Sequence, residues 1–365
     1  MMSSHALKHP RKASVALVLA VAVAVGAATA VTLVAVRSDG GSTPVAAPAA
    51  HPASAATVSL PTTVRDNEGT EASVTTLSDP QGHVRTPGEL AAGPDGSLWF
   101  TADHGQVGRI NPGGEFSVYS DPAGRIAFAD SMITGSDGAM WFTTGGDVVG
   151  RVTTAGEMTS VPVGSGDPGG PLGLAAGPDG NIWFTTASNQ IGRMTPAGEV
   201  ALFDGTAADA LFPAHITAGP DGNLWFTNLN SRIGRVTPSG EVVTFDAKDV
   251  GAGSGIAAGP DGNIWFTSAI GNRIGRITPD GAVTSFDAAA AGSSEPSVIT
   301  AGPDQSLWFA TVNGRIGRVT VDGAITAYDT STADVRAPHG LAMGPDGNLW
   351  FTSMTNSRIG FIRPS

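Results

Sequence analysis

The sequence predicts an all-β fold, a seven-bladed β-propeller with four-stranded blades. Three observations predict it. Seven tryptophans recur at intervals of 40 to 43 residues, each stands in the same short frame, and each repeat holds alternating runs separated by turn residues. The composition agrees, because 50 Gly, 25 Pro and only 14% charged residues are typical of many turns and short strands rather than long helices.

The shared frame of the repeats is a turn followed by a strand. Its copies read GPDGSLWFT, GSDGAMWFT, GPDGNIWFT, GPDGNLWFT, GPDGNIWFT, GPDQSLWFA and GPDGNLWFT. Pro and Asp suit the corners of the turn, and the Trp has enough area to fill the wedge between neighbouring blades. The next strand contains IGR or a close variant, whose Gly allows a ring or a backbone to approach closely.

The two ends of the repeat region predict how the ring closes. The last repeat stops at RIGFIRPS, after its third strand, so it lacks an outermost strand. Residues 71–79 (EASVTTLSD) precede the first repeat and resemble the fourth strand of other repeats, such as EVVTFD. We therefore expect a propeller over residues 71–365, closed by 71–79, because this pairing removes the open sheet edges.

The N-terminal segment, residues 1–37, predicts a signal peptide or an N-terminal membrane anchor. Basic KHPRK precedes an uncharged stretch, Ala13 to Val36, which is long enough to span a bilayer although cleavage remains an alternative. Both alternatives place the rest of the chain outside the cytoplasm, secreted or anchored, with the membrane met only through this segment. Residues 38–70 are rich in Ala, Pro, Ser and Thr and predict a disordered spacer.

Charge and cysteine content restrict the classes of partner and site. The formal net charge is −12, which repels phosphate backbones, so we expect no nucleic-acid partner. The absence of cysteine excludes a disulfide scaffold and thiolate metal sites. We expect a monomer that takes a small-molecule or peptide ligand at the mouth of the propeller.

Residues that break the repeat are better candidates for function than residues present in every blade. The Asp of the turn and the Arg after IG recur almost throughout, so we interpret them as structural caps and pairs. The loops that lead into the innermost strands converge on one mouth of the central channel, and they differ from blade to blade. Their unusual residues are Glu89, Asp130, His215, Glu295 and His339, with Phe128, Met132 and Phe212 as apolar neighbours.

The repeated GPDGxLWFT and IGRIT blocks, with closure by an N-terminal strand, resemble the virginiamycin B lyase (streptogramin B lyase) family over residues 71–365. The resemblance implies a carbon–oxygen lyase that opens cyclic depsipeptide antibiotics by elimination. A histidine acts as general base in that family, and glutamates hold Mg²⁺. Pro338-His339-Gly340 matches the family's base motif before the last blade, so His339 is the expected catalytic residue.

Other functional positions of the family differ in this chain. The two metal-binding glutamates correspond to Ala337 and to Ser353 or Met354, and the substrate-facing histidine of the sixth blade corresponds to Ser297. Mg²⁺ is thus implied by the resemblance but not supported by these residues. Two alternatives follow, a metal-assisted lyase and a non-catalytic propeller that binds a ligand or a protein.

A rebuilt site is a further hypothesis. Glu295 enters blade six and is expected near His339 as a metal ligand, with Asp130 and Glu89 as additional carboxylates. His215, Phe212, Ser297 and Asp130 are the expected substrate contacts. His215 lies in PAHIT, one place later than in a PHAIT arrangement, and one place along a strand reverses the direction of a side chain.

Overall fold

The computed structural model describes residues 51–126, 128–164 and 170–364. The expected leader, residues 1–37, and the first part of the expected spacer lie outside these residues. A search of the described ranges finds no helix with the length and apolar character needed to cross a membrane.

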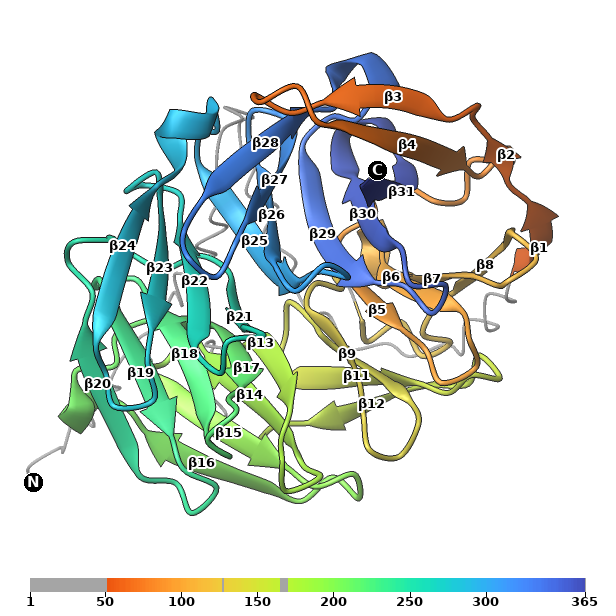
Figure 1. The fold of residues 1–365 in the computed structure, drawn as a ribbon. Coiled ribbons are helices and arrows are strands. Elements are labelled where there is room, and N and C mark those ends of the chain that lie inside the picture. Colours follow the sequence, from red (N-terminus) through yellow and green to blue (C-terminus); the bar gives the residue numbers. More distant parts are fainter. Residues whose placement is uncertain (1–50, 127, 165–169, 365) are drawn as a thin grey trace, which may run out of the picture.

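Seven antiparallel sheets stand in a ring around a central channel (Figure 1), which confirms the seven-bladed propeller with four-stranded blades. The innermost strands are β5 (Leu90–Ala92), β9 (Met132–Thr134), β13 (Pro171–Ala176), β17 (Pro213–Ala218), β21 (Ile256–Ala258), β25 (Pro296–Ala301) and β29 (Pro338–Met343). The second strands, which carry the Trp, are β6 (Leu98–Thr101), β10 (Met140–Thr143), β14 (Ile182–Thr186), β18 (Leu224–Asn228), β22 (Ile264–Ser268), β26 (Leu307–Thr311) and β30 (Leu349–Ser353).

The outer half of each blade is equally regular. The third strands are β7 (Val107–Ile110), β11 (Val148–Val152), β15 (Gln190–Met194), β19 (Arg232–Val236), β23 (Arg273–Ile277), β27 (Arg315–Val319) and β31 (Arg358–Pro364). The outermost strands are β8 (Glu115–Tyr119), β12 (Met158–Pro162), β16 (Val200–Asp204), β20 (Val242–Asp246), β24 (Val283–Asp287), β28 (Ile325–Asp329) and β4 (Glu71–Ser78). Short 3-10 helices follow some of the strands: η1 (Asp103–Gly105), η2 (Thr206–Ala208), η3 (Ala288–Ala291), η4 (Ser331–Ala333) and η5 (Met354–Asn356).

Blade 7 is completed by the N-terminal strand that the sequence predicts. Strand β4 pairs with β31 over six residue pairs, from Ile359 opposite Leu77 to Pro364 opposite Ala72, and the two strands lie side by side in Figure 1. The first and last parts of the propeller therefore share one sheet, which leaves no open seam.

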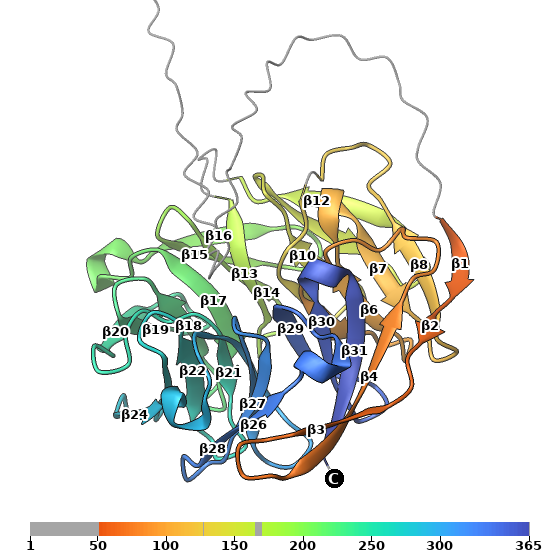
Figure 2. The same cartoon turned by 90° about the horizontal axis from the view of Figure 1, so that it is seen from above.

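The described part of the expected spacer differs from the expectation of disorder. It forms β1 (His51–Ala55), β2 (Thr57–Val58) and β3 (Thr62–Arg65). Strand β1 pairs with β8 on the outer edge of blade 1 (Figure 2), whereas β2 and β3 both pair with β4 of blade 7. Backbone pairing and one buried valine order a segment whose composition alone favours a flexible chain.

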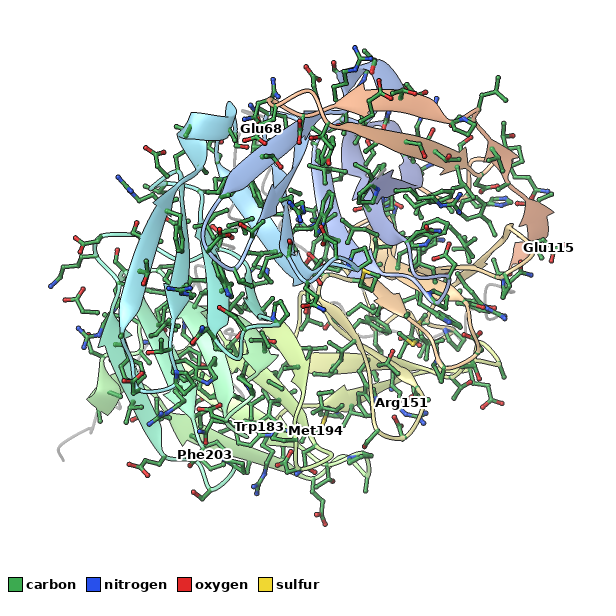
Figure 3. The ribbon with its side chains drawn as sticks, viewed as in Figure 1. Glu68, Glu115, Arg151, Trp183, Met194 and Phe203 are labelled. Carbon is green, nitrogen blue, oxygen red and sulfur yellow. The ribbon has the colours of Figure 1, made fainter. Side chains whose placement is uncertain are left out.

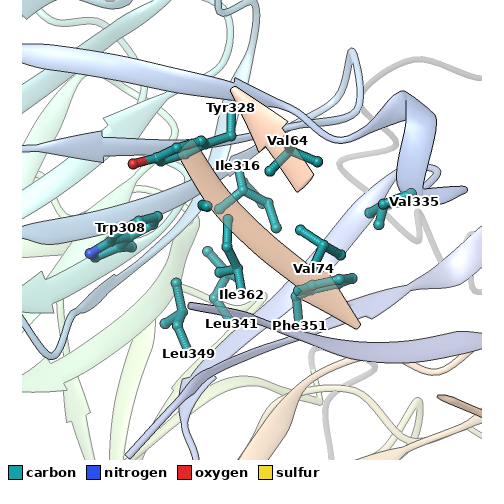
Figure 4. Close-up of a cluster of buried hydrophobic side chains, with 13 residues drawn as sticks. Val64, Val74, Trp308, Ile316, Tyr328, Val335, Leu341, Leu349, Phe351 and Ile362 are labelled. Carbon is teal, nitrogen blue, oxygen red and sulfur yellow. The ribbon is translucent and has the colours of Figure 1, made fainter. Parts of the chain in front are cut away.

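That valine, Val64, joins the segment to the core. It packs in one buried cluster with Trp308 and Tyr328 of blade 6 and Phe351 of blade 7 (Figure 4). The Asn67 side chain accepts a hydrogen bond from the backbone N–H of Ala327 at 3.0 Å. Residues 51–70 thus bridge the junction of blades 6, 7 and 1.

The blades are held by a repeated aromatic core. Six of the seven Trp rings are fully buried, and most stack on an aromatic ring of the outermost strand, as Trp183 does on Phe203 at 5.7 Å (Figure 3). The Gly of each IGR block leaves room for the Phe that follows the Trp: a Cβ on Gly192 would meet the Phe184 ring at 2.0 Å. These contacts explain why the frame recurs.

The turns at one end of the propeller repeat a single hydrogen bond. In every blade the indole N–H of the Trp donates to the carboxylate of the turn Asp, at 2.9–3.1 Å. In blades 1 to 5 the Arg of the next strand lies over the Trp ring at 5.5–5.8 Å. The interpretation of these Asp and Arg residues as structural caps and pairs is confirmed. We call this side of the molecule the turn end.

Candidate functional site

The central channel holds a cavity of about 350 Å³ that the innermost strands of all seven blades line and that reaches the end opposite the turn end. We call this end the mouth. Its residues come from the start of each innermost strand, where two consecutive positions vary from blade to blade. The first mouth position is Gly88, Asp130, Leu172, Ala214, Ser254, Ser297 and His339 in blade order. The second mouth position is Glu89, Ser131, Gly173, His215, Gly255, Val298 and Gly340.

A threonine hydroxyl fixes the second mouth position in most blades. In blades 1, 3, 4, 5 and 7 the Thr after the Trp-Phe pair accepts a hydrogen bond from the N–H of that position, as in Glu89 to Thr101 at 3.0 Å and Gly340 to Thr352 at 2.8 Å. In blades 3, 4, 5 and 7 the same hydroxyl donates to a carbonyl of the next blade, and Thr352 reaches Gly88 at 2.8 Å. These bridges tie four of the blades to their neighbours beside the cavity.

The two mouth positions lie in a β-bulge in the blades whose inner strand begins with Pro. In blade 7, Pro338 faces Ser353 and Leu341 faces Phe351, so three steps on one strand oppose two on the other. Blades 3, 4 and 6 show the same shift. An extra residue interrupts the strict alternation of side chains, so residues at both positions can face the mouth.

The bulge changes the expectation for His215. In a regular strand, a shift of one place would turn the His215 side chain away from the mouth. In the structure His215 is exposed and lines the cavity from the second mouth position of blade 4. His339 occupies the first position of blade 7. The two imidazoles are close enough that His215 contributes to the lowering of the pKa of His339. The offset therefore leaves both histidines at one site.

The contact that stands out at the mouth joins the last blade to the first. The Nδ1 atom of His339 lies 3.6 Å from a carboxyl oxygen of Glu89, a distance that brings the groups into contact but is too long for a hydrogen bond. Nδ1 is buried and has no hydrogen-bond partner within the described residues. The His339 ring as a whole is 40% exposed, so it can meet a ligand.

Burial and charge favour neutral forms for both partners. Burial, together with the negative charge of Asp130, raises the pKa of Glu89 to about 8. Burial lowers the pKa of His339, Asp130 opposes this effect, and His215 adds to it. Near pH 7 the pair therefore consists of a protonated carboxyl and a neutral imidazole, the states that suit an acid and a base.

The other expected contact residues occupy different surroundings. Asp130 is exposed at the first mouth position of blade 2, and its charge acts on both Glu89 and His339. The hydroxyl of Ser297 donates to the carbonyl of Ala310 at 3.3 Å, within its own blade. Phe212 is exposed at the rim, with a positive φ of 50° immediately before Pro213.

Glu295 is not part of a cluster of candidate metal ligands. It is exposed, and its N–H donates to the side chain of Asn272 at 3.0 Å. Across the described ranges no group of three or more His, Asp or Glu side chains is arranged to hold a metal ion. The apolar Ala337 and the fully buried Ser353, whose hydroxyl is bonded to the backbone of Arg336, supply no carboxylate either. At the two mouth positions the carboxyl groups are Glu89 and Asp130, and burial favours the uncharged form of Glu89. This donor set does not fit Mg²⁺, which prefers several charged oxygen ligands.

The segments that lead into blades 2, 3 and 4 carry exposed apolar side chains, which we call the apolar rim. Phe128, Leu172 and Phe212 come from blades 2, 3 and 4, and each leaves a large part of its side chain exposed. Consecutive exposed apolar side chains beside a cavity are typical of a ligand-binding surface. The mouth thus combines an apolar rim with an acid–base pair.

The sequence placed Glu89 among the carboxylates of a hypothetical metal site and did not predict its contact with His339. The signal that points to this contact is Gly340. A Cβ at Gly340 would lie 2.4 Å from the carbonyl oxygen of Gly88 and 3.0 Å from the Cα of Glu89. Only glycine lets blade 7 approach blade 1 this closely, and the residue beside it is His339.

Comparison with known proteins agrees with the fold and the repeat. The sequence model of the virginiamycin B lyase family matches residues 74–294 and 253–365. No curated protein sequence matches the chain.

Among solved structures, a streptogramin B lyase superposes with a TM-score of 0.72 at 30% identity, covering 80% of this chain and 97% of its own. A catalytically inactive histidine-to-alanine variant of virginiamycin B lyase from Staphylococcus aureus, with quinupristin, gives 0.72 at 31% identity and covers 80% and 99%. The selenomethionine form of that lyase gives 0.71 at 31% identity over the same shares.

Proposed function

The chain belongs to the virginiamycin B lyase family, and we propose that it is a carbon–oxygen lyase that opens an ester-containing cyclic peptide of the streptogramin B type. The observation that carries the proposal is His339, a half-exposed imidazole held neutral beside a cavity of ligand size. A neutral imidazole near pH 7 is a suitable general base.

The similar solved proteins support this assignment. Their names state a lyase acting on streptogramin B, and one of them is an inactive histidine-to-alanine variant with quinupristin. Pro338-His339-Gly340 keeps the family's base motif. The apolar rim of Phe128, Leu172 and Phe212 would receive the aromatic and alkyl groups of such a ligand.

The reaction follows from the position of the base. His339 removes the proton α to a carbonyl group, a carbon–carbon double bond forms, and the β carbon–oxygen bond breaks with its electron pair on the departing carboxylate. Because the side chains at the mouth do not fit a metal ion, no step is assigned to one.

A second candidate is a propeller of the same family that binds a ligand or a protein without catalysis. It is favoured by one observation, the replacement of the family's two metal-binding glutamates by Ala337 and by Ser353 or Met354. We also propose an extracytoplasmic location for a monomeric propeller. The basic and then uncharged residues 1–37, outside the described part of the structure, support the location.

The test is incubation of the full chain with quinupristin, followed by mass spectrometry with fragmentation. Elimination yields a linear product of unchanged mass that carries a new double bond, whereas hydrolysis adds the mass of one water. We expect the linear isomer with the wild type and with His104→Ala, which removes an 81% exposed imidazole that lies against Asp103. We expect a loss of about 10²–10⁴-fold with His339→Ala. Absence of product from the wild type, together with bound quinupristin, would instead favour the binding propeller.

A further inference from the structure

The buried carboxyl of Glu89 is a functional group to which neither the family's functional positions nor the blade architecture gives a role. Glu89 stands at the second mouth position of blade 1, and its backbone is fixed by the hydrogen bond to Thr101. Its side chain is only 17% exposed and lines the central cavity among aliphatic residues such as Leu90 and Met132. A carboxyl in such a place needs a partner or a proton.

Among the residues that the structure describes, no Lys or Arg side chain forms an ion pair with Glu89. Asp130 of blade 2, an anion, raises its pKa, and His339 of blade 7 lies in contact with it but is disfavoured in its charged form by its own burial. His215, from blade 4, lines the same cavity. Desolvation and the repulsion by Asp130 both favour the protonated carboxyl. The channel therefore stores a proton beside the imidazole.

The contact between Glu89 and His339 is built into the backbone. Gly340 removes the Cβ that would collide with Gly88 and Glu89, and Thr352 ties the two blades together through the Gly88 carbonyl. The result is the 3.6 Å approach of Nδ1 to the carboxyl. With Nδ1 turned toward Glu89, Nε2 is the nitrogen left to accept a proton from a ligand. Contacts of this kind often shorten when a substrate binds.

We propose that Glu89 is the general acid of this site, a proton donor that replaces the electrophilic metal ion for which the described residues form no group of three ligands. The inference rests on the proposed function and gives it a second catalytic residue. It also explains how a family member can keep the base motif while lacking the metal-binding glutamates.

During the elimination, His339 accepts one proton from the substrate and Glu89 donates one to it. Nε2 of His339 takes the α proton as the double bond forms. The β carbon–oxygen bond breaks, and the departing carboxylate receives the proton of Glu89. The site is left with an imidazolium beside a carboxylate, at the distance of an ion pair. Transfer of the Nδ1 proton to Glu89 then restores two neutral groups and leaves the imidazole protonated on Nε2. Loss of the Nε2 proton to solvent and uptake of a solvent proton at Nδ1 return the starting tautomer, with no oxidant, reductant or metal required.

The first arm of the test measures the proton itself. The chain has only eight glutamates, so ¹³C-carboxyl labelling of glutamate in the full chain gives resolvable NMR titrations. We expect one carboxyl to titrate near pH 8, and its signal to be missing in Glu89→Gln but present in Glu241→Gln, an exposed glutamate outside the mouth. Titration of every glutamate in the ordinary range near 4.3 would overturn the proposal, whatever substrate the site takes.

The second arm measures turnover of quinupristin against pH and chelator. The wild type and Glu241→Gln are expected to be insensitive to EDTA and to lose activity as the pH rises through 8, because Glu89 then loses its proton. Glu89→Gln keeps the shape but cannot donate a proton, so its kcat should fall about 10²–10⁴-fold, and the alkaline limb should disappear.

The two arms separate the possible failures. Activity that EDTA abolishes and Mg²⁺ restores would overturn the acid role of Glu89 while leaving the lyase function intact. A wild type without turnover would overturn the proposed function, and the NMR titration would then judge by itself whether Glu89 stores a proton. Full activity in Glu89→Gln would refute its acid role directly.

Discussion

The two ends of this propeller contrast sharply in their side chains. At the turn end, seven blades repeat one arrangement, in which a buried Trp donates to an Asp carboxylate. At the mouth, the first and second mouth positions hold different residues in almost every blade. The same blade backbone forms both ends, so the difference reflects their roles. The repeated contacts of the turn end stabilise the blades, whereas the varied residues of the mouth are available to a ligand.

The contrast separates stability from chemistry. A residue required by the geometry of every blade recurs in every blade, whatever its chemical nature. Asp179, for example, is a carboxylate whose surroundings are explained by Trp183 and Asn181. Glu89 is a carboxylate with no counterpart in the other blades, and its surroundings are explained only by His339 and Asp130. Asp179 is therefore part of the repeat, whereas Glu89 departs from it.

The largest expected effect is a difference in pH dependence between the two ends. At the mouth, the folded state holds the Glu89 proton up to about pH 8, against an ordinary value of 4.5, so the free energy of unfolding falls as pH rises between these values. His339, with its lowered pKa, gives the opposite slope below 6.5. The window from pH 6.5 to 8 therefore isolates Glu89. There the wild type should lose about 2 kcal/mol relative to Glu89→Gln, measured by urea unfolding.

The turn end has the opposite sign. For Asp179 burial alone would raise the pKa, but hydrogen bonds from Asn181 and Trp183 outweigh it and hold the pKa below its usual range. Its contribution to stability is present above the ordinary Asp pKa and is lost as the pH falls through the lowered value. If the free energy of unfolding changed equally with pH in the wild type and in Glu89→Gln between pH 6.5 and 8, the two ends would not differ in this way.

The next effect is the loss of one turn contact. In Asp179→Ala the buried indole N–H of Trp183 loses its acceptor, which should lower the free energy of unfolding by about 1.5 kcal/mol. Asp179→Asn retains an acceptor oxygen and should recover part of it. Turnover per folded molecule should stay unchanged, as thermal unfolding and quinupristin assays on the same samples would show. A matching fall in kcat would mean that the turn end also serves catalysis.

A smaller effect is expected at the apolar rim. Phe212 is 45% exposed, so about half of its surface remains for a ligand to cover. Phe212→Ser should weaken quinupristin binding by about 1 kcal/mol, or roughly fivefold. Calorimetric titration in a His339→Ala background keeps the ligand intact during the measurement. Val321→Ser changes an exposed apolar residue of the β27–β28 turn and should leave the affinity as it was.

The smallest effect concerns blade 6, which lacks the threonine itself. Blade 6 has Ala310 where the other blades have Thr. Ala310→Thr is expected to add the missing bridge to blade 7 and to raise the free energy of unfolding by about 0.5–1 kcal/mol. Chemical denaturation of the pair of proteins measures it. A destabilised variant would show that Val298, which occupies the neighbouring second mouth position, already fills the space.

Much of the fold was predictable because it repeats. Seven copies of one frame gave the blade number, and the missing last strand pointed to 71–79 as its replacement, which β4 confirms. Strands β1, β2 and β3 were not predicted. They are short, they lie in an Ala- and Pro-rich segment, and their partners β4 and β8 come later in the chain. Val58, Leu60 and Val64 are the large apolar residues there, and only Val64 is buried, so their pattern predicts no strand with a buried face.

The site was predictable only in part, because it is made by contacts between blades. His339 follows from a local motif. Its approach to Glu89 joins residues 250 positions apart and depends on a bulge that the alternation of a regular strand does not include. Glu295 was predicted as a metal ligand from its place in an adjacent blade; its side chain is exposed, its backbone N–H donates to Asn272, and among the described residues it belongs to no group of three candidate ligands.

The most direct test of the division between the two ends is one paired experiment on His339→Ala and Asp179→Ala. Both variants are assayed for quinupristin turnover per folded molecule and for unfolding free energy under the same conditions. The division predicts that His339→Ala loses at least about 10²-fold in turnover with little change in stability, and that Asp179→Ala loses stability with turnover unchanged. The reverse pattern, or a loss of both properties in both variants, would contradict it.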